Sequence, residues 1–183
     1  LCHDNEYRSG VSNPKKSQPT WNNTHRRAVE LIGPDAHPHF NYAITEIVHC
    51  KSKDAIGVEA ASKHCIEKWM DSIFELSPAD VVILLGRHVR DHYAIPLLEA
   101  PTGFGSSNNY GDLSASERAK RDIFIREVGG KPRIFVFNWH PTAPAMRALH
   151  KVYGENVTEF LSKVVNGKDK VPSPDELAAK LGI

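Results

Sequence analysis

Apolar residues recur at intervals of three and four residues between positions 58 and 76, and this spacing predicts an amphipathic helix. The repeat passes through Val58, Ala61, Cys65, Trp69 and Ile73. Similar patterns and capping residues predict further helices at 24–32, 87–98, 114–128, 143–152, 156–165 and directly after Ser173. Ser114 and Glu117 form a capping box at the start of the helix at 114–128.

Short apolar runs predict three strands, at 42–48, 80–85 and 133–137. The run at 80–85 is nearly continuous, which is typical of strands that are covered on both faces in parallel sheets. Strands and helices alternate along the chain, and this order favours right-handed crossovers. The pattern therefore predicts an α/β fold with a parallel sheet and helices on both of its faces.

The residues near the end of each predicted strand are the candidates for function, because open α/β sheets bind ligands at the carboxyl ends of their strands. Basic or imidazole groups follow all three strands. The candidates are Glu46, His49, Lys51, Arg87, Asn138, His140, Pro141, Thr142 and Arg147. They predict an electropositive rim that suits an anionic ligand, with nucleic acid or nucleotide as the leading class. The alternative is that the cations at these positions are merely solvated.

His140 and Pro141 stand where the third predicted strand meets the next helix. Proline fixes its own φ and biases the preceding residue toward an extended backbone. Such a histidine would be held at the rim, where it could donate a hydrogen bond to a ligand or exchange a proton with it. In the alternative interpretation Pro141 starts a helix and His140 points to water.

Two of the three cysteines, Cys50 and Cys65, are candidate ligands of a zinc or iron–sulfur site, although a complete site needs about four ligands. Cys65 also fits the apolar face of its predicted helix as a small core residue. The long segment 99–113 is rich in Gly, Asn and Ser and contains Phe104 and Tyr110. An aromatic there could stack on a base, or the segment could be disordered.

Composition narrows the class of protein. The chain has 183 residues, of which 40% are hydrophobic and 25% charged, so we expect one globular domain across 1–183. Its net charge of +1 permits a local basic patch but is low for a non-specific nucleic-acid binder. No apolar run is long enough for a membrane span, and an odd number of cysteines favours a reducing compartment. We therefore expect an intracellular protein that does not bind membranes and is a monomer.

Three segments, in the same order along the chain, resemble the uracil-DNA glycosylase superfamily, most closely the branch that carries an iron–sulfur cluster. They are Tyr42–Lys51 (YAITEIVHCK), Ala79–Arg87 (ADVVILLGR) and Phe137–Thr142 (FNWHPT). Cys65 falls where that branch has its next cluster cysteine. The resemblance spans about residues 40–150.

The resemblance implies a three-layer α/β/α sandwich around a short parallel sheet, and an enzyme that flips a damaged base out of DNA and hydrolyses its N-glycosidic bond. His140 would be the catalytic residue and would stabilise negative charge on the leaving base. Glu46 would line the base pocket, in place of the asparagine of that branch. Pro141 and Thr142 would contact the DNA backbone, and Arg87 and the stretch that includes Arg147 would hold phosphates.

The chain also departs from this family. Nothing in residues 1–20 matches the family's water-activating loop, so we expect the natural chain to extend upstream of Leu1, unless a diverged member uses another first strand. The first cysteine pair of the cluster is absent as well. No cofactor is therefore expected from this chain alone, and Cys50 and Cys65 would bind a cluster only with upstream cysteines. Two other hypotheses remain: a non-catalytic nucleic-acid-binding protein on the same fold, and a flavodoxin-like module that binds a nucleotide.

Overall fold

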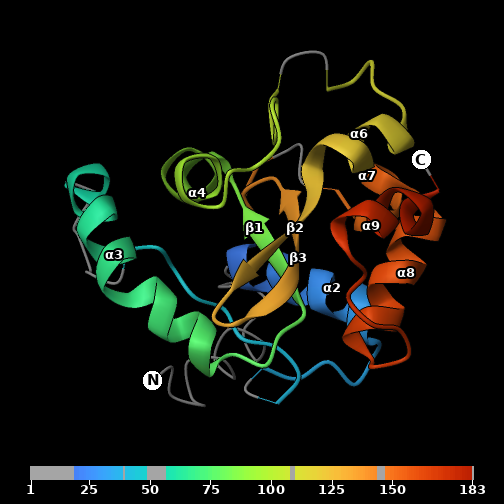
Figure 1. Ribbon diagram of the computed structural model, residues 1–183, viewed down its shortest axis with the longest axis horizontal. Helices are drawn as coiled ribbons and strands as arrows, with labels where there is room; N and C mark the ends of the chain where they lie inside the picture. The colour runs from blue at the N-terminus through green and yellow to red at the C-terminus, as the bar shows by residue number, and fades with distance from the viewer. Residues whose placement is uncertain (1–18, 39, 49–56, 108–109, 144–146, 183) are drawn as a thin grey trace.

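A small mixed sheet lies at the centre of the structure, with the strand order β1-β3-β2 (Figure 1). The computed structural model describes residues 19–38, 40–48, 57–107, 110–143 and 147–182. Strand β1 (Val81–Leu85) pairs in parallel with β3 (Lys131–Asn138), and β2 (Ile123–Val128) pairs with β3 in antiparallel orientation. The predicted α/β class is confirmed.

Helices surround the sheet and confirm most of the predicted pattern. Their bounds are α2 Pro19–Ile32, α3 Val58–Leu76, α4 Arg87–Val89, the π-helix η3 Arg90–Ala94, α5 Ile95–Leu97, α6 Ala115–Asp122, α7 Leu149–Tyr153, α8 Glu155–Val165 and α9 Pro174–Leu181. The elements α4, η3 and α5 follow one another without a break and form the helix predicted at 87–98. Capping boxes start both α6, at Ser114, and α9, at Ser173. In the described residues, no helix is long and apolar enough to cross a membrane.

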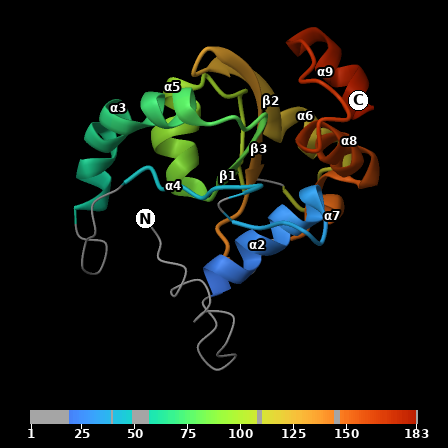
Figure 2. The same cartoon turned by 90° about the horizontal axis from the view of Figure 1, so that it is seen from below.

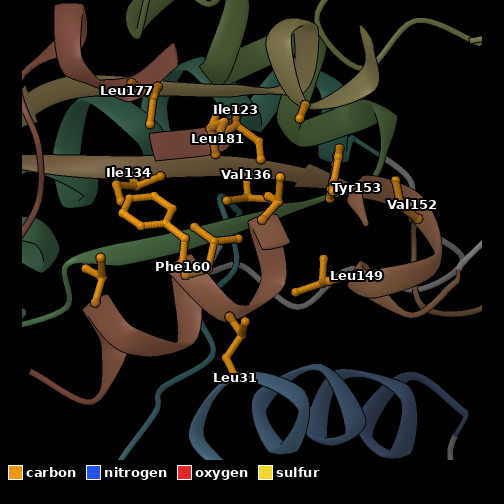
Figure 3. Close-up of a cluster of buried hydrophobic side chains, with 14 of the residues drawn as sticks. Leu31, Ile123, Ile134, Val136, Leu149, Val152, Tyr153, Phe160, Leu177 and Leu181 are labelled. Carbon is orange, nitrogen blue, oxygen red and sulfur yellow. The ribbon is translucent and has the colours of Figure 1, made fainter. Parts of the chain in front are cut away.

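Two clusters of buried side chains lie on opposite faces of the sheet. Side chains of β3 alternate between them, as the pleat of a strand requires. Ile134 and Val136 join a cluster that includes Leu31, Leu149, Leu161 and Leu181 from α2, α7, α8 and α9 (Figure 3). Phe135 and Phe137 join the other cluster, with Cys65, Ile66, Met70 and Phe74 of α3 and with Phe104. The continuous apolar run of β3 is thus explained by burial on both faces.

The predicted strand at 42–48 is wrong. Residues 43–48 form no regular element, and the only bridge described there joins Pro38 to Tyr42. Of this segment Ile47 and Val48 are buried, whereas Ile44 and Glu46 are exposed. A β-rich sequence needs a neighbouring strand to pair with, because strand propensity mostly reflects packing on a sheet.

The end of the helix predicted at 114–128 is also wrong, and with it the prediction of an all-parallel sheet. Helix α6 stops at Asp122, and the chain continues as β2. Ile123 and Ile125 enter one core cluster and Phe124 enters the other, which is the alternation of a strand. Gly129 and Gly130, with φ of +62° and +74°, then close a tight hairpin to β3. The helix predicted at 143–152 is shorter too, since α7 begins at Leu149.

Candidate functional site

The carboxyl ends of β1 and β3 meet, because the two strands are parallel neighbours. The backbone N–H of Gly86 donates to the carbonyl of Asn138 at 2.8 Å. A Cβ atom on Gly86 would lie 3.2 Å from Cβ of His140. The structure therefore brings the Gly86–Arg87 turn and the His140 loop together, as expected from the rule that ligand sites form at strand ends.

His140 opens a β-turn that fixes the orientation of its ring. The carbonyl of His140 accepts from the N–H of Ala143 at 2.8 Å, with Pro141 at the second position of the turn, where its φ is favourable. The N–H of Thr142 donates to Nδ1 of His140 at 3.3 Å, and the Thr142 hydroxyl lies 2.8 Å from the same nitrogen. Because a backbone N–H can only donate, this contact favours the tautomer whose proton is on Nε2. Because His140 is exposed, the turn presents an N–H donor to solvent.

Helix α2 lies beside the segment that carries His140 and is hydrogen-bonded to it (Figure 2). The side-chain amide of Asn23 donates to the carbonyl of Pro141 at 2.6 Å. Two turns further along, Oε1 of Glu30 accepts from both the backbone N–H and Nδ1 of His150, each at 2.8 Å. Arg27, between them on the same side of the helix, forms an ion pair with Glu30 at 3.2 Å. Burial is the main cause that lowers the pKa of Arg27. Both ends of the segment 141–150 are thus attached to one helix.

Seven of the other predicted site residues fall into three groups. Arg87, Thr142 and Arg147 are exposed next to these strand ends or on the segment that follows β3. Asn138 is buried, and its amide is used internally: Oδ1 accepts from the N–H of Trp139 at 2.8 Å, and Nδ2 donates to the carbonyl of Arg147 at 3.4 Å. The third group, His49, Cys50 and Lys51, lies outside the described residues.

Pro141, Glu46 and Cys65 are placed differently from the expected site. Pro141 is buried, and its backbone carbonyl accepts a hydrogen bond from Asn23 of α2. Glu46 is exposed on a segment without strand structure, so nothing described holds it against His140. Cys65 is 1% exposed within the cluster around α3, which agrees with the core interpretation. Within the described ranges, no three His, Cys, Asp or Glu residues gather as metal ligands.

Sequence reasoning missed three partners of the site. Asn23 and Glu30 support the His140 segment from α2, and only a polar stripe on that helix could have pointed to them. Tyr110 packs against Trp139, the residue before His140, with ring centroids 5.6 Å apart. Tyr110 was noted as an aromatic in a long polar segment, but nothing in the sequence indicated its contact.

Replacing Gly86 by alanine is expected to destabilise the protein by about 1–3 kcal/mol, because φ of +90° with ψ of 171° is open to glycine almost alone. The new methyl group would also press on Cβ of His140 and displace the loop. Urea denaturation measures the loss. Gly130→Ala is the matched control: its φ is +74°, but no atom lies within 4 Å, so only about 1 kcal/mol is expected. Equal losses for the two variants would contradict close packing of Gly86 on His140.

The stability of the protein should fall as the pH drops below about 6.5, the ordinary value of a histidine pKa. Burial, with a smaller contribution from His92, lowers the pKa of His88, whose Nε2 lies 2.8 Å from the hydroxyl of Ser62. A lowered pKa means that the unfolded chain binds this proton first, so the stabilisation is complete above the unfolded pKa and is lost toward lower pH.

Urea denaturation of the wild type and of His88→Gln at pH 7.5 and 5.5 tests this pH dependence. The loss between the two pH values should be smaller in His88→Gln. His64, exposed on the outer side of α3, provides the control, and His64→Gln should keep the loss seen in the wild type. The same pH dependence in His88→Gln and the wild type would contradict the assignment to His88.

Comparison with known proteins assigns the chain to no family. No protein-family model matches the chain, and neither a curated protein nor a solved structure matches it. A function for the site has to be argued from the residues and from the contacts that hold them.

Proposed function

We propose that this chain is a DNA-glycosylase-like protein that hydrolyses the N-glycosidic bond of a flipped, damaged base such as uracil. The observation that carries the proposal is the position of His140, which is exposed at the joined ends of β1 and β3 in a turn whose contacts with Thr142 favour a proton on Nε2. The resemblance of three ordered segments to the uracil-DNA glycosylase superfamily supports it. Helices on both faces of the sheet fit the α/β/α sandwich of that superfamily.

The chemistry needs a donor at this place. When the bond between sugar and base breaks, its electron pair stays with the base, and negative charge develops on a base carbonyl. A fixed N–H donor stabilises that charge more than it stabilises the uncharged base, which lowers the barrier. Water then adds to the sugar, and the base takes up a proton. A His140 ring with its proton on Nε2 can supply this donor.

Phosphate contacts would position the DNA. Arg87 follows the Gly86 turn directly, and Arg147 is tied to the end of β3 through its carbonyl and Asn138. Both side chains are exposed. Cations near the site attract the backbone without reading base sequence, and their contribution weakens as salt rises. The near-neutral net charge agrees with a local contact rather than a broad basic surface.

Incubation of the chain with single- and double-stranded oligonucleotides that contain one uracil tests the proposal. The expected result is time-dependent release of free base and an alkali-sensitive abasic site, with binding that weakens as salt is raised. A matched oligonucleotide with thymine in place of uracil serves as the control for base recognition. DNA binding without release of any base, over a range of damaged bases, would exclude the glycosylase activity.

A second candidate is a non-catalytic nucleic-acid-binding protein. It is favoured by Glu46, because this carboxylate is exposed on a segment without strand structure instead of lining a pocket beside His140. In the described part of the chain, Thr142 is the side chain that bonds to the His140 ring, and no carboxylate does so. This candidate predicts salt-dependent affinity for DNA and no base release, so the same assay separates the two functions.

A further inference from the structure

We propose that Tyr110 is a positioning residue of the candidate site: it holds Trp139 and so fixes the direction in which the adjacent His140 points. The rings of Tyr110 and Trp139 meet edge to face, with centroids 5.6 Å apart and an interplanar angle of 75°. Trp139 in turn meets Phe137 of β3 at 5.3 Å and 80°. Aromatic pairs prefer such geometry, and each contributes about 0.5–1.5 kcal/mol beyond its buried area. Trp139 is thus packed between the sheet and Tyr110.

Tyr110 is itself held from several sides. The guanidinium groups of Arg118 and Arg121 lie over its ring, 5.1 and 5.0 Å from the centroid. Nε of Arg118 also donates to the backbone carbonyl of Tyr110 at 3.1 Å. Burial raises the pKa of Tyr110 to about 12, and a hydrogen bond with Tyr153 opposes that rise. A ring in contact with two guanidinium groups and with Tyr153 has little freedom to move away from Trp139.

Tyr153, the hydroxyl partner of Tyr110, is in contact with β3, the strand that ends at the site. Tyr153 is buried and its hydroxyl donates to the carbonyl of Phe137 at 2.5 Å. Tyr110 is therefore connected to the end of β3 through Tyr153 and through the ring of Trp139, the residue that follows the strand.

The preceding part of the segment 99–113 is anchored to the same region. The N–H of Gly105 donates to Oδ1 of the buried Asp122 at 2.8 Å, and Arg90 donates to the carbonyl of Gly105 at 2.8 Å. Asp122 also accepts from Nε and Nη2 of Arg121, at 2.8 and 3.0 Å. Arg121 thus links the anchor at Gly105 to the ring of Tyr110. These contacts favour a supporting role for the segment over contact with DNA by stacking of Tyr110.

The inference deepens the proposed function, because positioning affects a rate only if His140 acts in the reaction. The test therefore has two readouts, on Tyr110→Phe, Tyr110→Leu and Tyr110→Ala. Tyr110→Phe keeps the ring and loses only the hydroxyl, so it is the matched control. Tyr110→Leu keeps most of the volume and remains a test even where Tyr110→Ala unfolds; near-ultraviolet circular dichroism shows which variants are folded.

The first readout is the long-range proton–nitrogen NMR spectrum of the histidine rings, which reports the tautomer of His140 without any substrate. The wild type and Tyr110→Phe should show the Nε2–H tautomer alone, and the folded Leu and Ala variants should show averaged signals of both tautomers. An unchanged His140 signal in a folded Leu or Ala variant overturns the inference, whatever the protein's activity.

The second readout is the kinetics of base release. Loss of the ring should lower kcat about 10- to 100-fold and leave KM within about twofold, since a misplaced donor costs rate rather than affinity. If the wild type releases no base, the proposed function fails while the NMR result still decides the positioning. A normal kcat in Tyr110→Leu, with active wild type, overturns the role of Tyr110 in the reaction.

Discussion

Replacement of His140 by alanine is expected to lower the rate of base release by about 10²–10³-fold, the usual loss when one donor to a developing anion is removed. The His140 ring is exposed, in a turn that is also held by Asn23 and by the backbone bond from Ala143. The thermal midpoint of unfolding should therefore change little. Single-turnover measurement of base release, with the variant in excess over DNA, separates the chemical step from product release.

Affinity for DNA should change little in His140→Ala, because the proposed phosphate contacts come from Arg87 and Arg147. His64→Ala, an exposed histidine on α3, is the control and should release base at the wild-type rate. If His140→Ala is as fast as the wild type, His140 has no part in the mechanism. A lower affinity with an unchanged single-turnover rate at saturation would reduce its role to binding.

Replacement of Arg133 by methionine is expected to lower the free energy of unfolding by about 3–5 kcal/mol, comparable with the loss when a buried charge network is broken. Arg133 is 1% exposed in β3. Its guanidinium donates to the carbonyls of Phe74 and Ser77 at 2.6 and 2.9 Å, to Val128 at 3.0 Å and also to Ala79.

Through these bonds one side chain joins the end of α3, the residues just before β1 and the hairpin between β2 and β3. The carbonyls at the end of a helix have no partner within it and carry partial negative charge, which a cation satisfies. The Arg133 guanidinium also lies over the Phe74 ring, 5.3 Å from its centroid. Methionine fills part of the volume but removes one donor from each of the four carbonyls.

Urea denaturation compares this variant with Lys131→Met in the same strand. Lys131 bonds to Asp80 at 2.7 Å, but both side chains are substantially exposed, so a loss of at most about 1 kcal/mol is expected. Arg133→Lys should lie between the two, because one ammonium group cannot reach all four carbonyls in a planar fork. A loss below about 1 kcal/mol for Arg133→Met would show that water replaces the guanidinium at these carbonyls.

The errors in the predicted elements have a common physical origin. The sequence IFIREVGGKPRIFVF has β-branched and aromatic residues on both sides of a Gly-Gly pair, which is a hairpin signal. This hairpin signal is easily missed, because the capping box at Ser114 predicts where a helix begins but not where it ends. Conversely, residues 42–48 have strand-like composition, yet apart from the bridge between Pro38 and Tyr42 they pair with no strand among the described residues. Strand formation depends on a neighbour that local sequence does not specify.

The candidate site was predictable in part. The junction of two strand ends followed from the parallel pairing of β1 and β3, and His140 and Arg87 were found because they directly follow apolar runs. Asn138 was assigned to the substrate for the same reason, but its burial and its two backbone bonds show that it holds the chain after β3. Position next to a strand end does not tell which way a side chain points.

The sequence by itself determined the α/β class, the helix at 58–76, both capping boxes and the apolar strands at 80–85 and 133–137. These features depend on periodicity and on contacts within a few residues, so each is present in the local sequence. Only the tertiary structure decided that β2 pairs in antiparallel orientation with β3 and that Arg133 donates to the carbonyls at the end of α3. It also decided the contacts of Asn23 and Tyr110 with the loop that carries His140. Those contacts join residues that are distant in the chain, and they form only when the two faces of the sheet are covered by their helices.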